Sequence, residues 1–154
     1  MYNNIRIFVV CIFILALAGC SSHKPDCYNE SNKELRLRWG SLITKSGKIT
    51  GYQLNYDSKL LKIGKKEDND NFTDSVLTII DGDRYCKLLA MTRDTILKIQ
   101  ALSEPGDSLH FIEYSDPPRN VRMRAVWNPT NKTYGSKGFR EIYDSLQTLL
   151  PVVR

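Results

Sequence analysis

The early part of the chain alternates polar and apolar positions with the period of two that is typical of strands. Leu35, Leu37 and Trp39 alternate with two arginines, and similar alternation returns after short turns that contain Gly47 and Asp57. Strands are therefore predicted over 34–45, 49–55 and 60–63. Three consecutive strands joined by short turns make an antiparallel meander, with one face free to pack against helices.

The pattern changes to a helical period from Asp83 onward, and the stretch Asp81-Gly82-Asp83 offers an N-cap. Apolar residues then recur every three or four positions, which predicts a helix over about 83–101. A second helix is predicted over 138–150, where the amphipathic pattern is clearest, and Pro151 ends it. The predicted buried stripes are Tyr85, Leu88, Leu89, Thr92, Ile96 and Ile99 in the first helix, and Phe139, Ile142, Tyr143, Leu146, Leu149 and Leu150 in the second.

A hairpin is predicted between these helices. Its strands span 109–114 and 121–127, with a proline-containing turn between them. The short apolar run at 76–80 fits either a strand or the approach to the first helix. The order predicts a single α+β domain in which an antiparallel sheet, a meander plus a hairpin, carries two helices packed on one face.

The first twenty residues have a different composition, that of a secretory leader. Arg6 is the only charged residue before Cys20, and twelve apolar residues follow it. This run is shorter than the ~20 residues that a transmembrane helix needs. It predicts a signal peptide rather than a permanent anchor.

The leader ends in Leu17-Ala18-Gly19-Cys20, which resembles the lipobox of bacterial lipoproteins. The resemblance implies a diacylglyceryl group on the Cys20 sulfur, cleavage before that residue and, in Gram-negative bacteria, acylation of the new amine. Two or three acyl chains hold a protein firmly at a bilayer, whereas one chain holds it only marginally. Because Ser21 rather than an aspartate follows, the resemblance also implies the outer membrane, facing the periplasm. The alternative is ordinary secretion, with cleavage elsewhere.

The expected organisation is a signal peptide over 1–19, a lipidated flexible tether over 20–33 and the α+β domain over 34–154. Cys11 would leave with the leader and Cys20 would carry lipid, so that Cys27 and Cys86 remain as a candidate disulfide in an oxidising compartment. Two free thiols are the alternative.

The net charge of +5 is mild and the charges are interspersed, which argues against a nucleic-acid partner.

No pattern of catalytic chemistry emerges from the residues. His23 and His110 have no second ligand at metal-binding spacing, and the carboxylates have no partners that the sequence can place beside them. We therefore predict no catalytic residue, no metal and no cofactor.

Four arginines alternate with apolar residues on two predicted strands. They are Arg36, Arg38, Arg122 and Arg124. They form either a solvated face or a cationic surface for carboxylates or phosphates.

The domain also resembles emfourin-type inhibitors of thermolysin-like metallopeptidases. The similar stretches are the strand and turn over 35–51, the hairpin over 52–60 and the closing helix over 139–150. The paired glycines of that family are missing after Gly40, so no inhibitory residue is carried over.

The sequence therefore predicts a lipid-anchored, non-enzymatic binding or structural module of the bacterial cell envelope. Its expected partners are membrane lipid, through acylated Cys20, and a second envelope protein. An envelope-tethered peptidase inhibitor is the alternative, and a small hydrolase ranks third.

Overall fold

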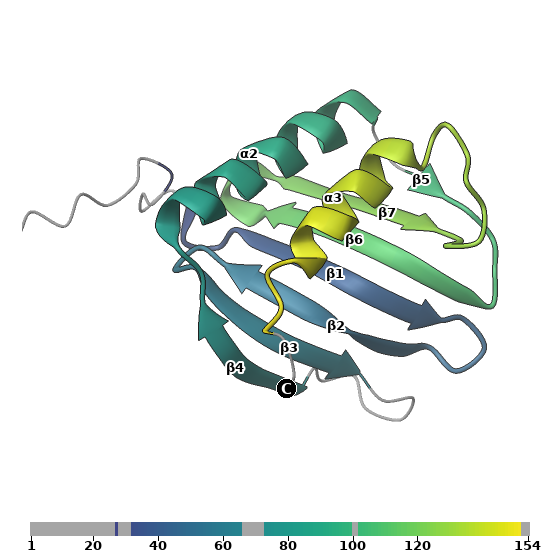
Figure 1. The fold of residues 1–154 in the computed structure, drawn as a ribbon, viewed down its shortest axis with the longest axis horizontal. Coiled ribbons are helices and arrows are strands. Elements are labelled where there is room, and N and C mark those ends of the chain that lie inside the picture. Colours follow the sequence, from purple (N-terminus) through teal and green to yellow (C-terminus); the bar gives the residue numbers. More distant parts are fainter. Residues whose placement is uncertain (1–26, 28–31, 66–72, 100–101, 152–154) are drawn as a thin grey trace, which may run out of the picture.

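The computed structural model describes residues 27, 32–65, 73–99 and 102–151 (Figure 1). The predicted signal peptide, Cys20 and most of the predicted tether lie outside these residues. Most of the charged segment between the third and fourth strands lies outside them as well.

The centre of the fold is a seven-stranded sheet in the order β4-β3-β2-β1-β6-β7-β5. The strands are β1 Arg36–Ile43, β2 Lys48–Asn55, β3 Lys59–Lys65, β4 Thr73–Ile79, β5 Leu102–Ser103, β6 Ser108–Asp116 and β7 Val121–Trp127. All neighbours are antiparallel except β5 and β7, which run parallel. The predicted meander and hairpin are joined edge to edge, because β1 pairs with both β2 and β6.

Two helices, α2 Gly82–Ile99 and α3 Lys137–Gln147, lie on the same side of this sheet (Figure 1). The carboxylate of Asp81 accepts a hydrogen bond of 3.2 Å from the Arg84 backbone N–H, which satisfies one of the unpaired donors at the start of α2. The hairpin turn is a short 3-10 helix, η2 Pro117–Arg119, and it ends at Asn120 in the left-handed conformation. These findings confirm the predicted α+β class and the single antiparallel sheet with two helices on one face.

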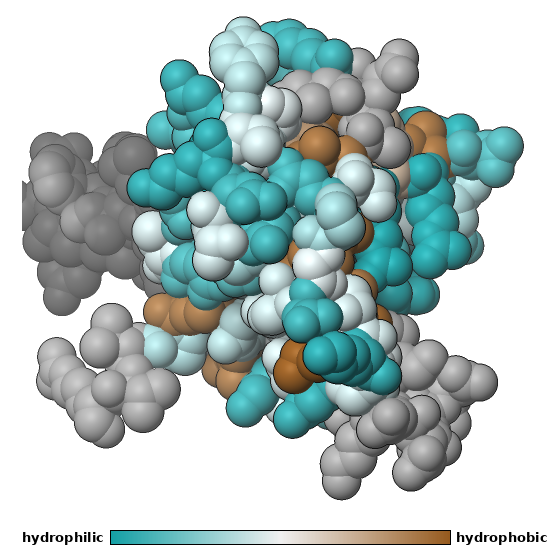
Figure 2. Space-filling model, turned by 90° about the vertical axis from the view of Figure 1, so that its right-hand side faces the viewer, coloured by the Kyte–Doolittle hydropathy of each residue, from teal (hydrophilic) through white to brown (hydrophobic). Residues whose placement is uncertain are grey.

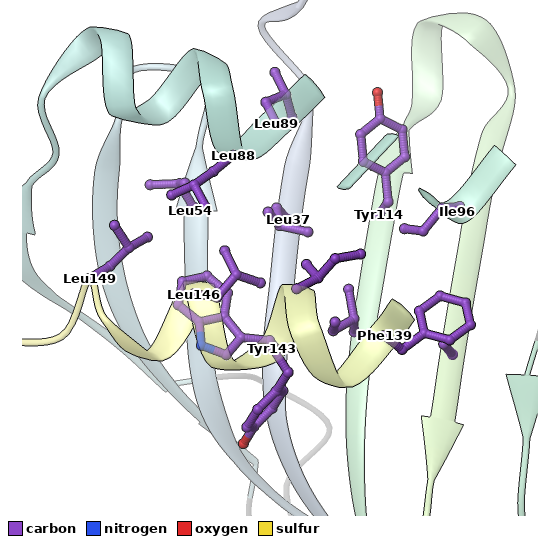
Figure 3. Packing of buried hydrophobic residues seen from close by; sticks show 14 of the residues in the cluster. Leu37, Leu54, Leu88, Leu89, Ile96, Tyr114, Phe139, Tyr143, Leu146 and Leu149 are labelled. Atoms are coloured by element: carbon purple, nitrogen blue, oxygen red, sulfur yellow. The ribbon is translucent and has the colours of Figure 1, made fainter. Parts of the chain in front are cut away.

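The core lies between the helices and the sheet. Most residues of the stripes predicted for both helices are buried there, together with Trp39 and Trp127 from the sheet. Leu150 is only partly buried, and the side chain of Ile99 lies outside what the structure describes. Figure 3 shows Leu54 of β2, Leu88 of α2 and Leu146 of α3 pointing into the same space. Thr92, the polar member of the α2 stripe, is fully buried, and its hydroxyl donates to the Leu88 carbonyl oxygen at 2.8 Å, so this buried donor has a partner.

Two glycines set the spacing of the two central strands. Gly40 of β1 and Gly51 of β2 lie directly opposite each other. A Cβ atom on Gly40 would come within 2.5 Å of the Gly51 Cα atom, and the φ of Gly40 is +157°. The backbones approach each other at a place where only glycine fits.

The run at 76–80, for which a strand and the approach to a helix were both predicted as alternatives, forms most of β4, an edge strand. The two-residue strand β5 was not predicted, because a segment this short has no measurable periodicity and is recognised only by its pairing with Ala125 and Val126.

Candidate functional site

The two cysteines predicted to remain in the mature chain meet at one end of the molecule. The sulfur atoms of Cys27 and Cys86 are bonded in a disulfide, and the two Cα atoms are 5.7 Å apart. Cys86 belongs to the second turn of α2, so the bond fixes residue 27 to that helix. The free-thiol alternative does not describe this structure. Cys20, the predicted lipidation site, lies outside the described residues.

A cavity of about 430 Å³ opens beside this disulfide, between α2 and the adjoining ends of β6 and β7. This volume falls in the range of about 300–1,000 Å³ that is usual for small-molecule sites. Its walls are mostly apolar, with a few polar groups. The lining residues are Cys27, Asn32, Leu35, Cys86, Leu89, Ala90, Arg93, Ile96, Tyr114, Asp116, Arg119, Val121 and Met123. We call this space the disulfide-side cavity.

Asp116 is the most unusual polar group of the disulfide-side cavity, since only 2 % of the residue is exposed. Its Oδ2 atom accepts a hydrogen bond from Nη1 of Arg119. Its Oδ1 atom is buried and has no hydrogen-bond partner among the described residues. Burying a carboxylate oxygen without a donor costs about 1–3 kcal/mol or more, so this oxygen has unused capacity to bind a donor.

Neighbouring groups hold Asp116 and its arginine in place. The Arg119 guanidinium also donates to Oδ1 of Asn32 at 3.1 Å, and the Asn32 amide donates to the Cys27 carbonyl oxygen at 2.7 Å. The chain of contacts therefore runs from the disulfide to Asp116. The pKa of Tyr114 is raised, mainly by burial and secondarily by the charge of Asp116, while two arginines oppose the shift. The Tyr114 phenol therefore stays protonated at neutral pH.

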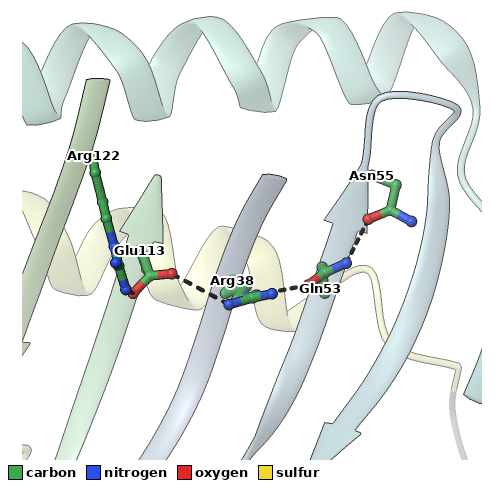
Figure 4. Close-up of polar contacts among 5 residues, drawn as sticks. All are labelled: Arg38, Gln53, Asn55, Glu113 and Arg122. Atoms are coloured by element: carbon green, nitrogen blue, oxygen red, sulfur yellow. Dashed lines mark hydrogen bonds and ion pairs between the residues drawn. The ribbon is translucent and has the colours of Figure 1, made fainter. Parts of the chain in front are cut away.

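The predicted arginine surface lies on the face of the sheet away from the helices, which we call the outer face. Figure 4 shows its polar side chains on the near side of the strands, with the helices behind. Nη1 of Arg38 lies 3.5 Å from one oxygen of Glu113, and Nη2 of Arg122 lies 3.5 Å from the other. Arg38 also donates through Nε to Oε1 of Gln53 at 2.6 Å. Glu113 thus neutralises part of the cationic surface.

Sequence reasoning gave Glu113 no partner, although the register explains its position. Glu113 lies opposite Arg38 on β1 and opposite Arg124 on β7. Cross-strand neighbours of opposite charge attract one another, but which strands are neighbours was not known from the sequence. Burial lowers the pKa of Arg38, and the negative charge of Glu113 opposes that shift.

The outer face is not fully exposed to solvent, whereas a solvated face was one of the two sequence predictions for it. Phe111 lies on it, opposite Gly40, and is only 3 % exposed. The Arg124 guanidinium carbon lies 5.4 Å from the centroid of the Phe111 ring, which is a cation–π contact. Of the four predicted arginines, three therefore have partners on the sheet itself, and they do not form one uniform anion-binding patch.

His110 packs on the helix side of the sheet. Its ring stacks on Tyr143, with a centroid distance of 4.4 Å, and meets Trp127 edge-on. Within the described ranges, no group of three or more His, Cys, Asp or Glu side chains could hold a metal ion. The helices in that part of the chain are also too short or too polar to cross a membrane.

The end of the molecule away from the disulfide-side cavity faces the viewer in Figure 2. It is mostly hydrophilic, and hydrophobic atoms appear there only in small separate areas. The disulfide-side cavity is therefore the better candidate for a binding site. No protein-family model matches the chain, and no curated protein sequence matches it. The resemblances to bacterial lipoproteins and to emfourin-type inhibitors stay predictions.

Proposed function

We propose that the chain is a lipid-anchored binding module of the bacterial cell envelope. Acyl chains on Cys20 hold it at the outer membrane on the periplasmic side, and the folded domain binds its ligand without catalysis. The observation that carries this proposal is the sequence Leu17-Ala18-Gly19-Cys20 at the end of an apolar leader.

The Cys27–Cys86 disulfide supports the same compartment, because structural disulfides persist in the oxidising periplasm and are rare in the cytosol. It also limits how far the domain can stand from the bilayer. Cys27 lies seven positions after Cys20, and a fully extended chain spans at most ~3.3–3.6 Å per residue. Residue 27 would therefore lie within about 25 Å of the lipidated residue.

The test is a pair of cysteine variants of the full chain. Cys20→Ala should abolish labelling by a radioactive or clickable fatty acid and should release the protein from sedimented membranes. Cys11→Ala is the matched control, because Cys11 lies in the same leader, and it should leave both labelling and sedimentation unchanged. Lipid labelling that persists in Cys20→Ala would refute the proposal.

A further inference from the structure

We propose that the disulfide-side cavity binds a monoacyl phospholipid whose head group carries a primary ammonium. This inference rests on the proposed lipid anchor, since the anchoring bilayer would supply the ligand. Three features of the cavity lead to it: its apolar walls, its buried carboxylate and its position next to the tether.

The walls suit a single acyl chain. The cavity is lined from α2, from β7 and from the residue before β1 by Leu35, Leu89, Ile96, Val121 and Met123. Leu89 and Ile96 belong to the buried core, so the apolar wall continues into the interior. Each methylene buried there should tighten binding about fourfold.

The head group is indicated by Asp116. Its Oδ1 atom is buried and has no donor in the described part of the chain, while Oδ2 is occupied by Arg119. A ligand that presents an N–H group to Oδ1 would relieve this deficit, and an ammonium would do so with a charge-assisted hydrogen bond. A quaternary ammonium has no N–H and cannot do so.

The phosphate is indicated by Arg93 on the α2 wall of the cavity. Its side chain is 58 % exposed, and its ion pair with Asp94 is long, with 3.7 Å between Nε and Oδ1. Arginine presents a planar set of donors that matches phosphate oxygens. With Arg119 held on Asp116, the cavity offers one anionic and one cationic contact to a zwitterionic head group.

The position of the cavity completes the argument. Cys27, one of its lining residues, lies only seven residues after Cys20. The tether therefore keeps the cavity within about 25 Å of the acylated residue, so lipids of the anchoring bilayer lie within reach of the site.

The experiment uses the full chain in a non-ionic detergent and counts one-to-one adducts by native mass spectrometry. The probes are two lysophospholipids with the same palmitoyl chain and the same phosphate, one with an ethanolamine and one with a choline head group. The ethanolamine lipid should bind about tenfold more tightly, because only it can donate to Asp116. Asp116→Asn should reduce this preference to less than about threefold.

A second variant keeps the test decisive if Asp116→Asn folds poorly. Ala90 lines the cavity from an exposed position on α2, so Ala90→Phe should obstruct the cavity and weaken both lipids at least about tenfold. Glu141→Phe, at an exposed position on α3 that does not line the cavity, is the control and should bind both lipids as the parent does.

Equal binding of the two lipids by the parent would overturn the inference, and so would unchanged binding by Ala90→Phe. The same spectra report the mass of the protein itself. An unmodified Cys20 in those spectra would defeat the proposed anchor, whatever the adducts show, so the two failures are distinguishable.

Discussion

Glu113 offers a direct test of how burial sets the strength of an ion pair. The carboxylate lies between two arginines, and both N–O distances are 3.5 Å. The two partners differ in exposure, since the side chain of Arg38 is 22 % exposed and that of Arg122 is 74 % exposed. Distance alone predicts equal coupling energies, whereas burial predicts unequal ones.

Coulomb's law at this distance gives about 5 kcal/mol with an effective dielectric constant of ~20, and about 1 kcal/mol in bulk water. The cost of removing the two charged groups from water offsets much of the attraction of about 5 kcal/mol. We therefore expect a net coupling of about 1.5 kcal/mol or more between Glu113 and Arg38, as for hydrogen bonds to charged groups. For the exposed Arg122 we expect about 0.5 kcal/mol or less.

The assay is two double-mutant cycles measured by urea denaturation. The first combines Glu113→Gln with Arg38→Met, and the second combines Glu113→Gln with Arg122→Met. The methionines keep much of the aliphatic volume and remove the charge. An unchanged m-value would show that the variants alter stability rather than the unfolded state. Coupling energies equal within about 0.3 kcal/mol would refute the reasoning.

The remaining predictions concern the disulfide and His110. Replacing Cys27 and Cys86 together by serine opens a loop of 59 residues, and the chain-entropy model predicts a loss of about 4 kcal/mol in the free energy of unfolding. Reduction of the parent protein should give a similar loss, and equal urea midpoints for parent and variant would contradict the role of the disulfide. Burial lowers the pKa of His110, although Asp144 opposes the shift, so the unfolded chain binds the proton more tightly than the folded one. Stability should therefore fall as the pH is lowered through about 6.5 and toward the folded pKa; His110→Gln should flatten this slope, and an identical slope would contradict the assignment.

Much of the fold could be predicted from local patterns. The period-two alternation around Trp39 and the period of the α3 stripe each report one buried face, and the structure buries those faces. The start of α2 within 81–83 was predictable because an N-cap depends only on residues a few positions apart, and the structure shows Asp81 in that role. These signals are local, and the sequence contains them completely.

The features that were missed depend on contacts between distant segments. β6 carries apolar residues toward both faces, with Phe111 on one and Ile112 on the other, so its alternation could not say which face was solvated. Glu113 meets Arg38 only because β1 lies between β2 and β6, an order that no local pattern records. Long-range pairing, rather than propensity, decides these positions.

The cavity was missed for the same reason. Asp116 precedes a proline-containing turn, and its sequence neighbours alone suggest an ordinary turn residue. Its burial follows from the packing of α2 against the ends of β6 and β7. An aspartate at the end of a hydrophobic strand is a weak signal, and only the assembled walls show that one of its oxygens is left without a donor.

Mass spectrometry of the mature N-terminal peptide tests the central claim most directly. We expect a chain that begins at Cys20, with a diacylglyceryl thioether on the sulfur and further mass on the amine. A free Cys20 thiol, or a chain that still carries the leader, would contradict it.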